Sequence, residues 1–489
     1  MILEDERRSS ARSTFGFKTY ESPFTLRYGS DEMRQIWSQE NSWIKARDVW
    51  IAVAGVQMEA GLVSRAEYQD LVDHRDEIDI ETILRREMDK EDPRYTGHDI
   101  VAGISEFSDK APLGGRILHK GLTSEDVLSN VEILLIHESL NIVEDRLKIA
   151  LSGFAKRIED HKDLVVVGFT HNQAAEPTTF GYRLARYAQD LVVDLESLRF
   201  LRGIVKGKGI KGAVGTSASF EKLLEGTEMT AEDHERKIME RLGIPAVTIS
   251  GQTYPRKFTL MTVATLAFIG QSCHQFASDM KLLQASPFDE VAEPRRRGQV
   301  SSSAMAHKEN PNNAENIKSL ARGLIGKVVE AWINASEVTL ERGLEDSAGK
   351  RSYLPEAFLA VDEILKRTDN IIRGLQVRET SIARNFRIFS PFMATETVLS
   401  HLSRGDVDRQ EMHELLRGKV TLALDAVRNG DPNPLQQLLA QDKVISEYLS
   451  PEELEELFSS VKDHVGDAPE RCERFLKNEL YPAINGGNN

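Results

Sequence analysis

The segment 301–316, SSSAMAHKENPNNAEN, strings three serines, a histidine, a lysine and several side-chain amides through few apolar residues. Such a segment cannot lie inside a helix bundle, because buried polar groups need hydrogen-bond partners that apolar neighbours do not supply. It is therefore either a solvated loop or a set of groups that receives a polar ligand. Hydroxyl, amide and ammonium groups all donate hydrogen bonds, so the chemistry they suit is the binding of carboxylates.

Three further polar clusters contain a Gly or a Pro: HKGLTSEDV (119–127), GFTHNQAAEPTTFG (168–181), and KGAVGTSASF (211–220) together with SGQTYPRKF (250–258). At a helix end, hydroxyls, unpaired N–H groups and the helix dipole can receive an anion. For any one cluster, helix capping is the commoner explanation. Four such loops between long helices, however, can meet at one end of a bundle and bind carboxylates without a metal or a nucleotide cofactor.

The helices that must position these loops are visible as apolar stripes. Between residues 124 and 161 apolar side chains recur at spacings of three and four, including Val127, Val131 and Leu135, which indicates one long helix. Thr123 and Asp126 resemble a capping box at its start, and Gly153 could interrupt it. The same period recurs over 180–205, 259–284 and 316–342. The sequence therefore predicts an all-α fold with a central antiparallel bundle of long helices.

The expected domain organisation has three parts. Helices predicted before and after the bundle are shorter, so boundaries are placed near Gly121 and Val377. This gives an N-terminal helical domain (1–120), a central long-helix bundle with the polar loop 301–316 (121–377), and a C-terminal helical domain (378–489). The length of 489 residues is well above the size at which one hydrophobic core stops growing.

Composition limits the classes of function. The formal charge of -15 opposes general attraction to nucleic acid or to an anionic membrane surface. Cys273 and Cys472 provide neither a disulfide framework nor a metal-ligand spacing. No segment reaches the roughly 18 apolar residues of a membrane span, and the N-terminus has no signal-peptide core. A cytoplasmic protein is expected.

The segment 301–316 resembles the signature loop of the fumarase/aspartase/argininosuccinate lyase superfamily. Other segments resemble one branch, the adenylosuccinate lyases, in order and spacing: RYGSDEM (27–33), GHDIVA (97–102), HKGLTSEDV, GFTHNQAAEPTTFGYRLA, KGAVGTSASF, SGQTYPRK and LEDSAGKRSYLPEAF (344–358). The similarity extends from about residue 20 to the C-terminal helices. It implies a three-domain fold whose central helices assemble into a homotetramer, with each active site built from loops of three subunits.

The resemblance also implies a reaction, the β-elimination of fumarate from adenylosuccinate and from succinyl-aminoimidazole carboxamide ribotide in purine biosynthesis. It implies no metal and no organic cofactor. A proton must leave a carbon beside a carboxylate, and the departing nitrogen must gain one. Two alternatives stay open: a sister lyase that releases fumarate from another N-succinyl compound, and a helical scaffold without activity. The presence of Ser302, His171, Lys308 and Glu315 together argues against the scaffold.

Four residues match the family's catalytic positions. Ser302 matches the general base, and a serine hydroxyl needs nearby donors to serve at neutral pH. Lys308 and the N–H groups after Ser302 are the available donors. His171 matches the general acid that protonates the leaving nitrogen, and Glu315 matches the carboxylate that pairs with this histidine.

The family's binding residues map onto both halves of the substrate. The resemblance assigns the succinyl carboxylates to Thr123, Ser124, Thr170, Lys308 and Asn310, with Met305 in the same loop. It assigns the nucleotide end to Arg27, Tyr28, His98, Asp99, Gln252, Arg342, Ser347 and Arg351. His119 matches a further histidine that positions the substrate. Arginine suits a phosphate because its planar fork meets two oxygens at once.

The sequence departs from the family pattern at several positions. Ser301 replaces a Gly and Ala306 replaces a Pro, so the loop loses one φ-permissive and one φ-fixed residue. Glu309 stands where adenylosuccinate lyases often have Arg. Gly97 replaces an Arg that helps to hold the phosphate, a loss worth about 1.5 to 3 kcal/mol. This last departure keeps the sister lyase open as an alternative.

Overall fold

The computed structural model describes residues 20–295, 298, 304–403 and 407–486, which fold almost entirely as helices. The chain divides into two compact units. Unit 1 comprises Met1–Leu147, Asp194–Gln271 and Ser319–Lys366. Unit 2 comprises Lys148–Val193, Ser272–Lys318 and Arg367–Asn489. Each unit thus takes three separate stretches of the chain, and the two are described separately below.

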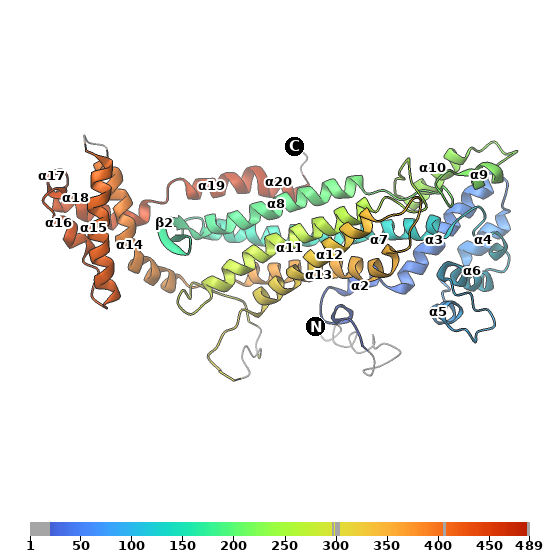
Figure 1. Cartoon of the computed structure of the whole chain (residues 1–489), viewed down its shortest axis with the longest axis horizontal. Coiled ribbons are helices and arrows are strands. Elements are labelled where there is room, and N and C mark those ends of the chain that lie inside the picture. The colour runs from blue at the N-terminus through green and yellow to red at the C-terminus, as the bar shows by residue number, and fades with distance from the viewer. Residues whose placement is uncertain (1–19, 296–297, 299–303, 404–406, 487–489) are drawn as a thin grey trace. The chain divides into compact units, whose positions relative to one another are not determined.

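Five long helices form the centre of the fold (Figure 1). They are α7 (Ser124–His161), α8 (Phe180–Ile204), α11 (Lys257–Leu283), α12 (Asn312–Ser336) and α13 (Asp346–Gly374). The first four confirm the predicted long helices. The fifth, α13, carries Pro355 in its interior. Every one of the five contributes residues to both units.

The predicted interruption of α7 at Gly153 is wrong. A Cβ atom at this position would lie 2.8 Å from Cγ2 of Ile372 on α13, closer than real Cβ contacts. Gly153 therefore lets two helices of unit 2 approach one another and does not break α7. The helix stays continuous because its apolar stripe is buried along the whole length, from Val127 to Ile158.

The other helices of unit 1 come from the N-terminal region and from the connection between α8 and α11. They are η2 (Pro23–Thr25), α2 (Asp31–Ile36), α3 (Gln39–Glu59), α4 (Arg65–Asp73), α5 (Ile80–Met88), α6 (Asp99–Lys110), η3 (Gly114–Ile117), α9 (Ala218–Leu223) and α10 (Ala231–Leu242). Local signals set their ends: Ser64 and Glu67 form a capping box at the start of α4. Gly243, with φ of 71°, ends α10 in the left-handed conformation.

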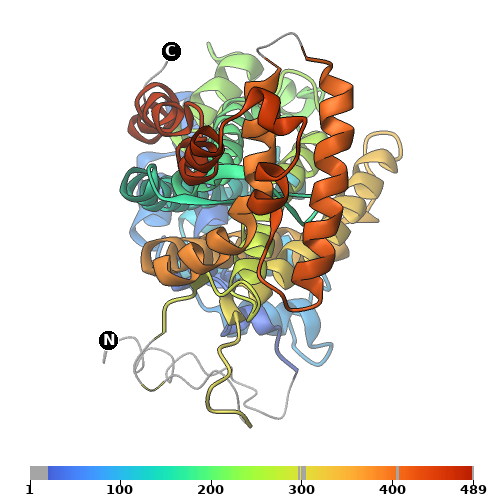
Figure 2. The same ribbon diagram turned by 90° about the vertical axis from the view of Figure 1, so that its left-hand side faces the viewer.

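Unit 2 holds the short strands and the C-terminal helices. These are β1 (Val165–Thr170), β2 (Gln173–Thr179), β3 (Val291–Ala292), β4 (Gln376–Val377), α14 (Glu379–Leu402), α15 (Arg409–Arg428), α16 (Leu435–Ala440), α17 (Ile445–Tyr448), α18 (Pro451–Ser459), η4 (Ser460–Asp463), α19 (Ala468–Phe475), the π-helix η5 (Leu476–Leu480) and α20 (Tyr481–Asn485). β1 pairs with β2 and β3 with β4, both antiparallel. Helix α14 packs against α15 and α18 (Figure 2).

Helix packing in unit 1 uses both close contacts and buried charge. A Cβ at Gly270 would lie 2.6 Å from a methyl of Leu324, so α11 and α12 meet closely there. Between α7 and α13, the Arg146 side chain donates to the buried carboxylate of Asp362 at 3.1 Å. In unit 2, aromatic rings mediate the packing, for example Phe154 of α7 against Phe276 of α11 with centroids 5.0 Å apart.

Two helices outside the predicted bundle are nearly as long as the bundle helices. Helix α3 has 21 residues and α14 has 24, against 25 for both α8 and α12. Helix length therefore does not mark the ends of the bundle, and the three domain ranges stay predictions. None of the helices in the described part of the chain is both long and apolar enough to cross a membrane.

Candidate active site

His171 lies at the tip of a β-hairpin in unit 2. The ladder pairs Thr170 with Gln173, so His171 and Asn172 alone make the turn. Their φ angles of 53° and 58° are both positive, which is the pattern of a type I′ turn, whose twist matches that of the two strands. All four residues of this tip are exposed. The hairpin thus presents the predicted general acid to its surroundings on a short, well-defined turn.

The base of this hairpin is anchored in unit 2. The ring of Phe169 meets Phe288 edge-on with centroids 5.4 Å apart, and Phe389 of α14 at 6.2 Å. At Gly168 the ladder shifts register, and a Cβ there would lie 2.6 Å from the carbonyl oxygen of Glu176. The sequence predicts only a polar loop between helices over residues 168–181. The β-branched run at Val165 to Val167 was the sequence signal that could have revealed the hairpin.

The signature segment is described from residue 304 onward, and the predicted base Ser302, like Ser301, lies outside the described residues. The Lys308 N–H donates to the carbonyl of Met305 at 3.1 Å, and the Asn312 N–H donates to that of Asn310 at 2.9 Å. The side chain of Lys308 is exposed. Two backbone turns therefore shape the segment and leave its ammonium group accessible to an anion.

Glu315 occupies the first turn of α12. Its Oε1 accepts a hydrogen bond from Nζ of Lys281 at 2.8 Å, and both side chains are about half exposed. Within one chain the partner of this carboxylate is therefore a lysine, and the pairing with His171 stays a prediction. The start of α12 is fixed by the buried Glu293, whose carboxylate accepts from the N–H groups of Asn313 and Ala314 at 2.9 and 2.7 Å.

In unit 1, His119 sits in the left-handed region with φ of 65°. Nε1 of Trp50 on α3 donates to its Nδ1 at 3.3 Å, which requires that Nδ1 carry no proton. Burial lowers the pKa of His119 below its ordinary value, and the charge of Asp126 opposes this only in part. The remaining nitrogen, Nε2, then carries the proton and can donate to a substrate oxygen.

Thr123 and Ser124 stand at the start of α7, where the capping expected from the sequence is confirmed in part. The Thr123 N–H donates to Oδ2 of Asp126 at 2.9 Å. Nζ of Lys208 donates to Oδ1 of the same carboxylate, and the side chains of Asp126 and Lys208 are both completely buried. The backbone N–H groups of Lys211 and Gly212 also donate to it at 3.1 Å. Asp126 therefore joins the start of α7 to the KGAVGTSASF loop.

The cations predicted for the nucleotide end gather near the start of α13. Nη1 of Arg342 donates to Asp346 at 2.8 Å and its Nη2 to Glu125 at 3.2 Å. Arg351, which is largely exposed, donates to Asp99 at 2.9 Å. Nδ1 of His98 lies 3.2 Å from Oδ1 of the same Asp99. The structure thus brings Arg351 to the neighbouring residues His98 and Asp99, which lie about 250 positions earlier in the sequence.

The other predicted residues of unit 1 are placed mainly by their backbones. The Gln252 N–H donates to the carbonyl of Glu341 at 2.9 Å, and that of Arg27 to Pro23 at 2.9 Å. Tyr28 stacks edge-on with Phe24, with centroids 5.8 Å apart. Gly97 has φ of 62°. An arginine in this conformation would be strained, so the departure at Gly97 changes the local backbone as well as removing a charge.

A buried charge network that sequence reasoning missed supports the start of α13. Nε of Arg256 lies 2.7 Å from Asp346, and Nζ of Lys350 lies 2.6 Å from Glu132 of α7. The Tyr254 hydroxyl donates to the other oxygen of Glu132. Burial raises the pKa of both carboxyls, but the neighbouring cations outweigh it, so the pKa of Glu132 and of Asp346 is lowered. The segment YPRK contains Tyr254 and Arg256, but the sequence did not indicate that these two side chains are buried.

Next to this network unit 1 has a cavity of about 240 Å³. Its wall contains two of the predicted nucleotide residues, Ser347 and Arg351, together with Lys350. Apolar side chains and two carboxylates, those of Glu125 and Glu132, also line it. A cavity with both hydrogen-bonding groups and apolar surface suits a ligand that carries polar groups and a flat apolar part.

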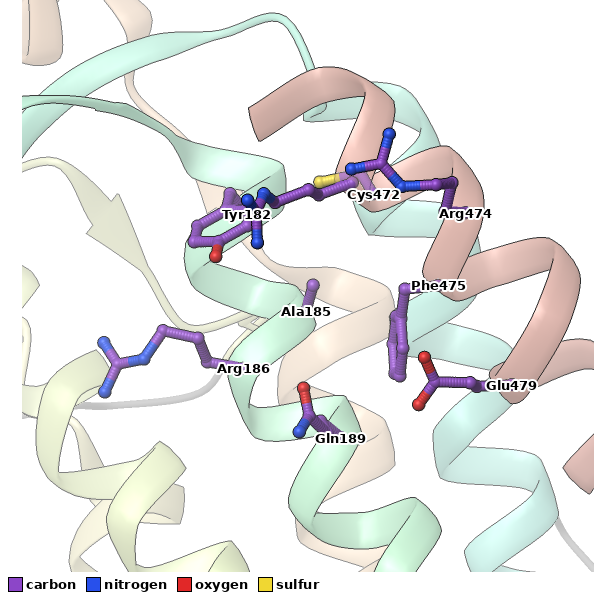
Figure 3. A pocket seen from close by; sticks show the side chains of 9 residues that line it. Tyr182, Ala185, Arg186, Gln189, Cys472, Arg474, Phe475 and Glu479 are labelled. Atoms are coloured by element: carbon purple, nitrogen blue, oxygen red, sulfur yellow. The ribbon is translucent and has the colours of Figure 1, made fainter. Parts of the chain in front are cut away.

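A second pocket, in unit 2, contains none of the predicted site residues. Figure 3 shows it between α8 and the helices that follow Asp467, lined by Tyr182, Arg186, Arg474 and Glu479 among others. Asp467 accepts hydrogen bonds from Arg471 at 2.6 Å and from Arg474 at 2.9 Å.

Within the described ranges, no cluster of three or more His, Cys, Asp or Glu side chains is placed to hold a metal ion. The predicted site residues carry hydroxyl, imidazole, ammonium, guanidinium and carboxylate groups. Such groups can bind anions, and they can transfer protons.

Comparison with known proteins identifies the family of the chain. A family described as Lyase matches residues 28–326, and one described as Adenylosuccinate lyase C-terminus matches residues 391–475. The chain is 34% identical to the adenylosuccinate lyase of Schistosoma mansoni over 476 residues, 96% of either chain. It is 33% identical to that of Saccharomyces cerevisiae, again over 96% of both, and 32% identical to that of Pyrococcus abyssi, over 93% of this chain and 97% of the relative.

Solved structures share the fold at lower identity. A fumarate lyase from Mesorhizobium sp. BNC1 matches with a TM-score of 0.80 at 22% identity, covering 94% of this chain and all of that one. A 3-carboxy-cis,cis-muconate lactonizing enzyme from Pseudomonas putida matches with a TM-score of 0.81 at 22% identity, covering 93% and 98%. With identity above 30% over nearly the whole length of several relatives, the chain belongs to the adenylosuccinate lyase family.

Proposed function

We propose that the chain catalyses the β-elimination of fumarate from adenylosuccinate, which gives AMP, and from succinyl-aminoimidazole carboxamide ribotide in cytoplasmic purine biosynthesis. The observation that carries this proposal is family membership at 34% identity over 96% of the chain. The presence of His171, Ser302, Lys308 and Glu315 supports it, because these are the residue types that the elimination requires.

The proposed reaction needs two proton transfers. A base removes a proton from the succinyl carbon beside a carboxylate, the C–N bond breaks, and the electrons of the C–H bond form the double bond of fumarate. We assign the removal to Ser302 and the protonation of the departing nitrogen to His171. The Lys308 ammonium would stabilise the negative charge that builds up on the carboxylate. The exposed hairpin tip that carries His171 supports its role, since a general acid must reach the substrate.

We assign the nucleotide to unit 1. Ser347 and Arg351 lie in the first two turns of α13 and line the cavity, and Arg342 precedes this helix and donates to Asp346. His119, held by Trp50 with its proton on Nε2, would donate to a substrate oxygen. The cations around α13 would replace the phosphate contact that an arginine at position 97 makes in relatives. This assignment favours the purine nucleotides over the N-succinyl compound of a sister lyase.

We further propose that the active protein is a homotetramer with shared active sites. In unit 1 five large apolar side chains on three long helices are more than half exposed: Phe200 on α8, Phe268 on α11, and Ile325, Val329 and Trp332 on α12. Monomeric proteins rarely expose apolar side chains in such number on adjacent turns, and patches of this kind mark interfaces. Copies of the same helices are the natural cover for them.

The direct test is to incubate the purified protein with each substrate at millimolar concentration and to measure fumarate. We expect turnover of both substrates. The His171→Gln protein, prepared in the same way, is the control for contaminating host enzyme. Absence of fumarate from both substrates would refute the proposal. Release of fumarate from another N-succinyl compound alone would favour the sister lyase.

A further inference from the structure

One amide side chain holds both ends of the segment that precedes α12. Gln284 follows directly after α11. Its Nε2 donates to the carbonyl oxygen of Glu309 at 3.0 Å, and its Oε1 accepts from the N–H of Glu293 at 3.0 Å. Glu293 and Glu309 are thus hydrogen-bonded to the same side-chain amide of unit 2.

The carboxylate of Glu309 is held as well. Nη2 of Arg378 donates to its Oε2 at 2.7 Å, and Nη1 of Arg295 lies 3.2 Å from its Oε1. Arg378 is itself fixed, because its guanidinium pairs with Asp289 and its N–H donates to the carbonyl of Glu290 at 2.8 Å. Glu309 is therefore anchored to the part of unit 2 that contains β3, β4 and the start of α14.

Glu309 lies between the two residues that are assigned to the substrate carboxylate. Lys308 precedes it and Asn310 follows it, and their positions depend on where the backbone of Glu309 lies. Since both the carbonyl and the carboxylate of Glu309 have fixed partners, the two flanking donors start from a defined backbone. A misplacement of about 1 Å near reacting groups can cost roughly 100-fold in rate, so this anchoring has consequences for catalysis.

We propose that Glu309, with its partners Gln284 and Arg378, is a positioning residue that sets the placement of Lys308 and Asn310. The inference rests on the proposed function. It also explains why this chain carries an acid where adenylosuccinate lyases often have an arginine. Facing Arg295 and Arg378, only an acidic side chain can form both ion pairs.

The test replaces Glu309 by Gln and by Arg. We expect Glu309→Gln to lower kcat about tenfold, within the range that misplacement near the reacting groups can cost. Glu309→Arg should lower it further, because the new cation would repel Arg295 and Arg378. The melting temperature should hardly change, since the pairs are partly exposed. The matched control is Arg417→Gln, which breaks an exposed ion pair with Glu414 on α15 and should leave kcat unchanged.

A double variant shows whether Glu309 acts through its partner. If it acts through Arg378, then Glu309→Gln combined with Arg378→Gln should lose no more activity than the more impaired single variant. Multiplication of the two losses would contradict the proposed coupling. A kcat of Glu309→Arg equal to that of the unmodified protein would overturn the proposal.

Hydrogen exchange provides a readout that does not depend on the reaction. Amides of residues 305–312 should exchange faster in Glu309→Gln than in the unmodified protein, with no change in Arg417→Gln. Unchanged exchange in this segment would overturn the anchoring even if the protein is an active lyase. Faster exchange in a protein without lyase activity would instead refute the proposed function and leave the anchoring standing.

Discussion

The two units treat their functional residues in opposite ways. In unit 1 the predicted binding residues adjoin buried charges: Asp126 and Lys208 are completely enclosed, and Arg342 donates to the buried Asp346. In unit 2 the predicted proton donor His171 lies at an exposed hairpin tip, and the side chain of Lys308 is exposed. Charges that bind an anion must be fixed in advance, whereas a proton-transfer group must be presented to the substrate. Changes to the buried charges and binding residues of unit 1 should therefore affect mainly stability and affinity, and changes to the proton-transfer groups of unit 2 should affect mainly kcat.

The largest effect is expected at the hairpin tip. His171→Gln removes the proton donor and should lower kcat by about 10²- to 10⁴-fold. The unfolding midpoint should stay the same because the side chain is exposed. Asn172→Gly is the matched control, since glycine accepts the positive φ of this position. Steady-state kinetics and thermal unfolding measure both quantities, and near-normal kcat in His171→Gln would assign the proton transfer elsewhere.

The next effect is on the stability of unit 1. Asp126→Asn leaves the ammonium of Lys208 buried without its counter-charge, which should reduce the free energy of unfolding by about 3–5 kcal/mol. Glu414→Gln, which breaks an exposed ion pair on α15, should cost about 0–1 kcal/mol. Urea unfolding at one fixed protein concentration compares the two variants. Equal losses would show that burial does not decide how much these two ion pairs contribute to stability.

Unit 1 should also lose stability in mild acid. His234 is fully buried, its ring nitrogens have no hydrogen-bond partner among the described residues, and burial lowers its pKa from 6.5 to about 4. The unfolded chain gains a proton below pH 6.5 while the folded chain does not, so stability is lost as pH falls from 6.5 towards 4. The loss should approach about 3 kcal/mol.

His234→Phe should remove this pH dependence, because phenylalanine has no titrating group and can keep the contact of the ring with Phe220. Unfolding free energies between pH 7 and pH 4 test this, with the exposed His413→Phe as the control. The same slope in the His234 variant and in the unmodified protein would contradict the assignment.

The smallest effect separates binding from chemistry. Arg351→Gln removes one cation from the proposed phosphate contacts and should weaken substrate binding by about 1.5 kcal/mol, the low end for a charged hydrogen bond. We expect roughly a tenfold rise in KM with kcat nearly unchanged. A fall in kcat without a change in KM would place Arg351 with the proton-transfer groups and would break the contrast between the two units.

The sequence predicted the long helices well because apolar periodicity is a local property. It failed where long-range packing decides. Gly153 looked like a helix interruption, but it serves the close approach of Ile372. The hairpin around His171 was hidden because polar tip residues masked the β-branched run before them. Arg256 belongs to the polar cluster 250–258, yet it is buried beside Asp346, a residue about ninety positions away that the local sequence does not reveal.

The same limit applies to the site. Motif resemblance placed His98 and Arg351 in one functional group, and the structure joins them through Asp99. Motif resemblance also paired Glu315 with His171, whereas one chain pairs Glu315 with Lys281. A pairing made between copies of a chain cannot be read from a single one.

The central claim is that copies of this chain share active sites, each combining a base from one copy with an acid from another. Its most direct test mixes inactive Ser302→Ala protein with inactive His171→Gln protein, after dissociation and reassociation of the subunits. If the two residues come from different copies, some sites in the mixed oligomer contain neither substitution, and part of the activity should return. A mixture that forms hybrid oligomers but stays as inactive as its two components would contradict the claim.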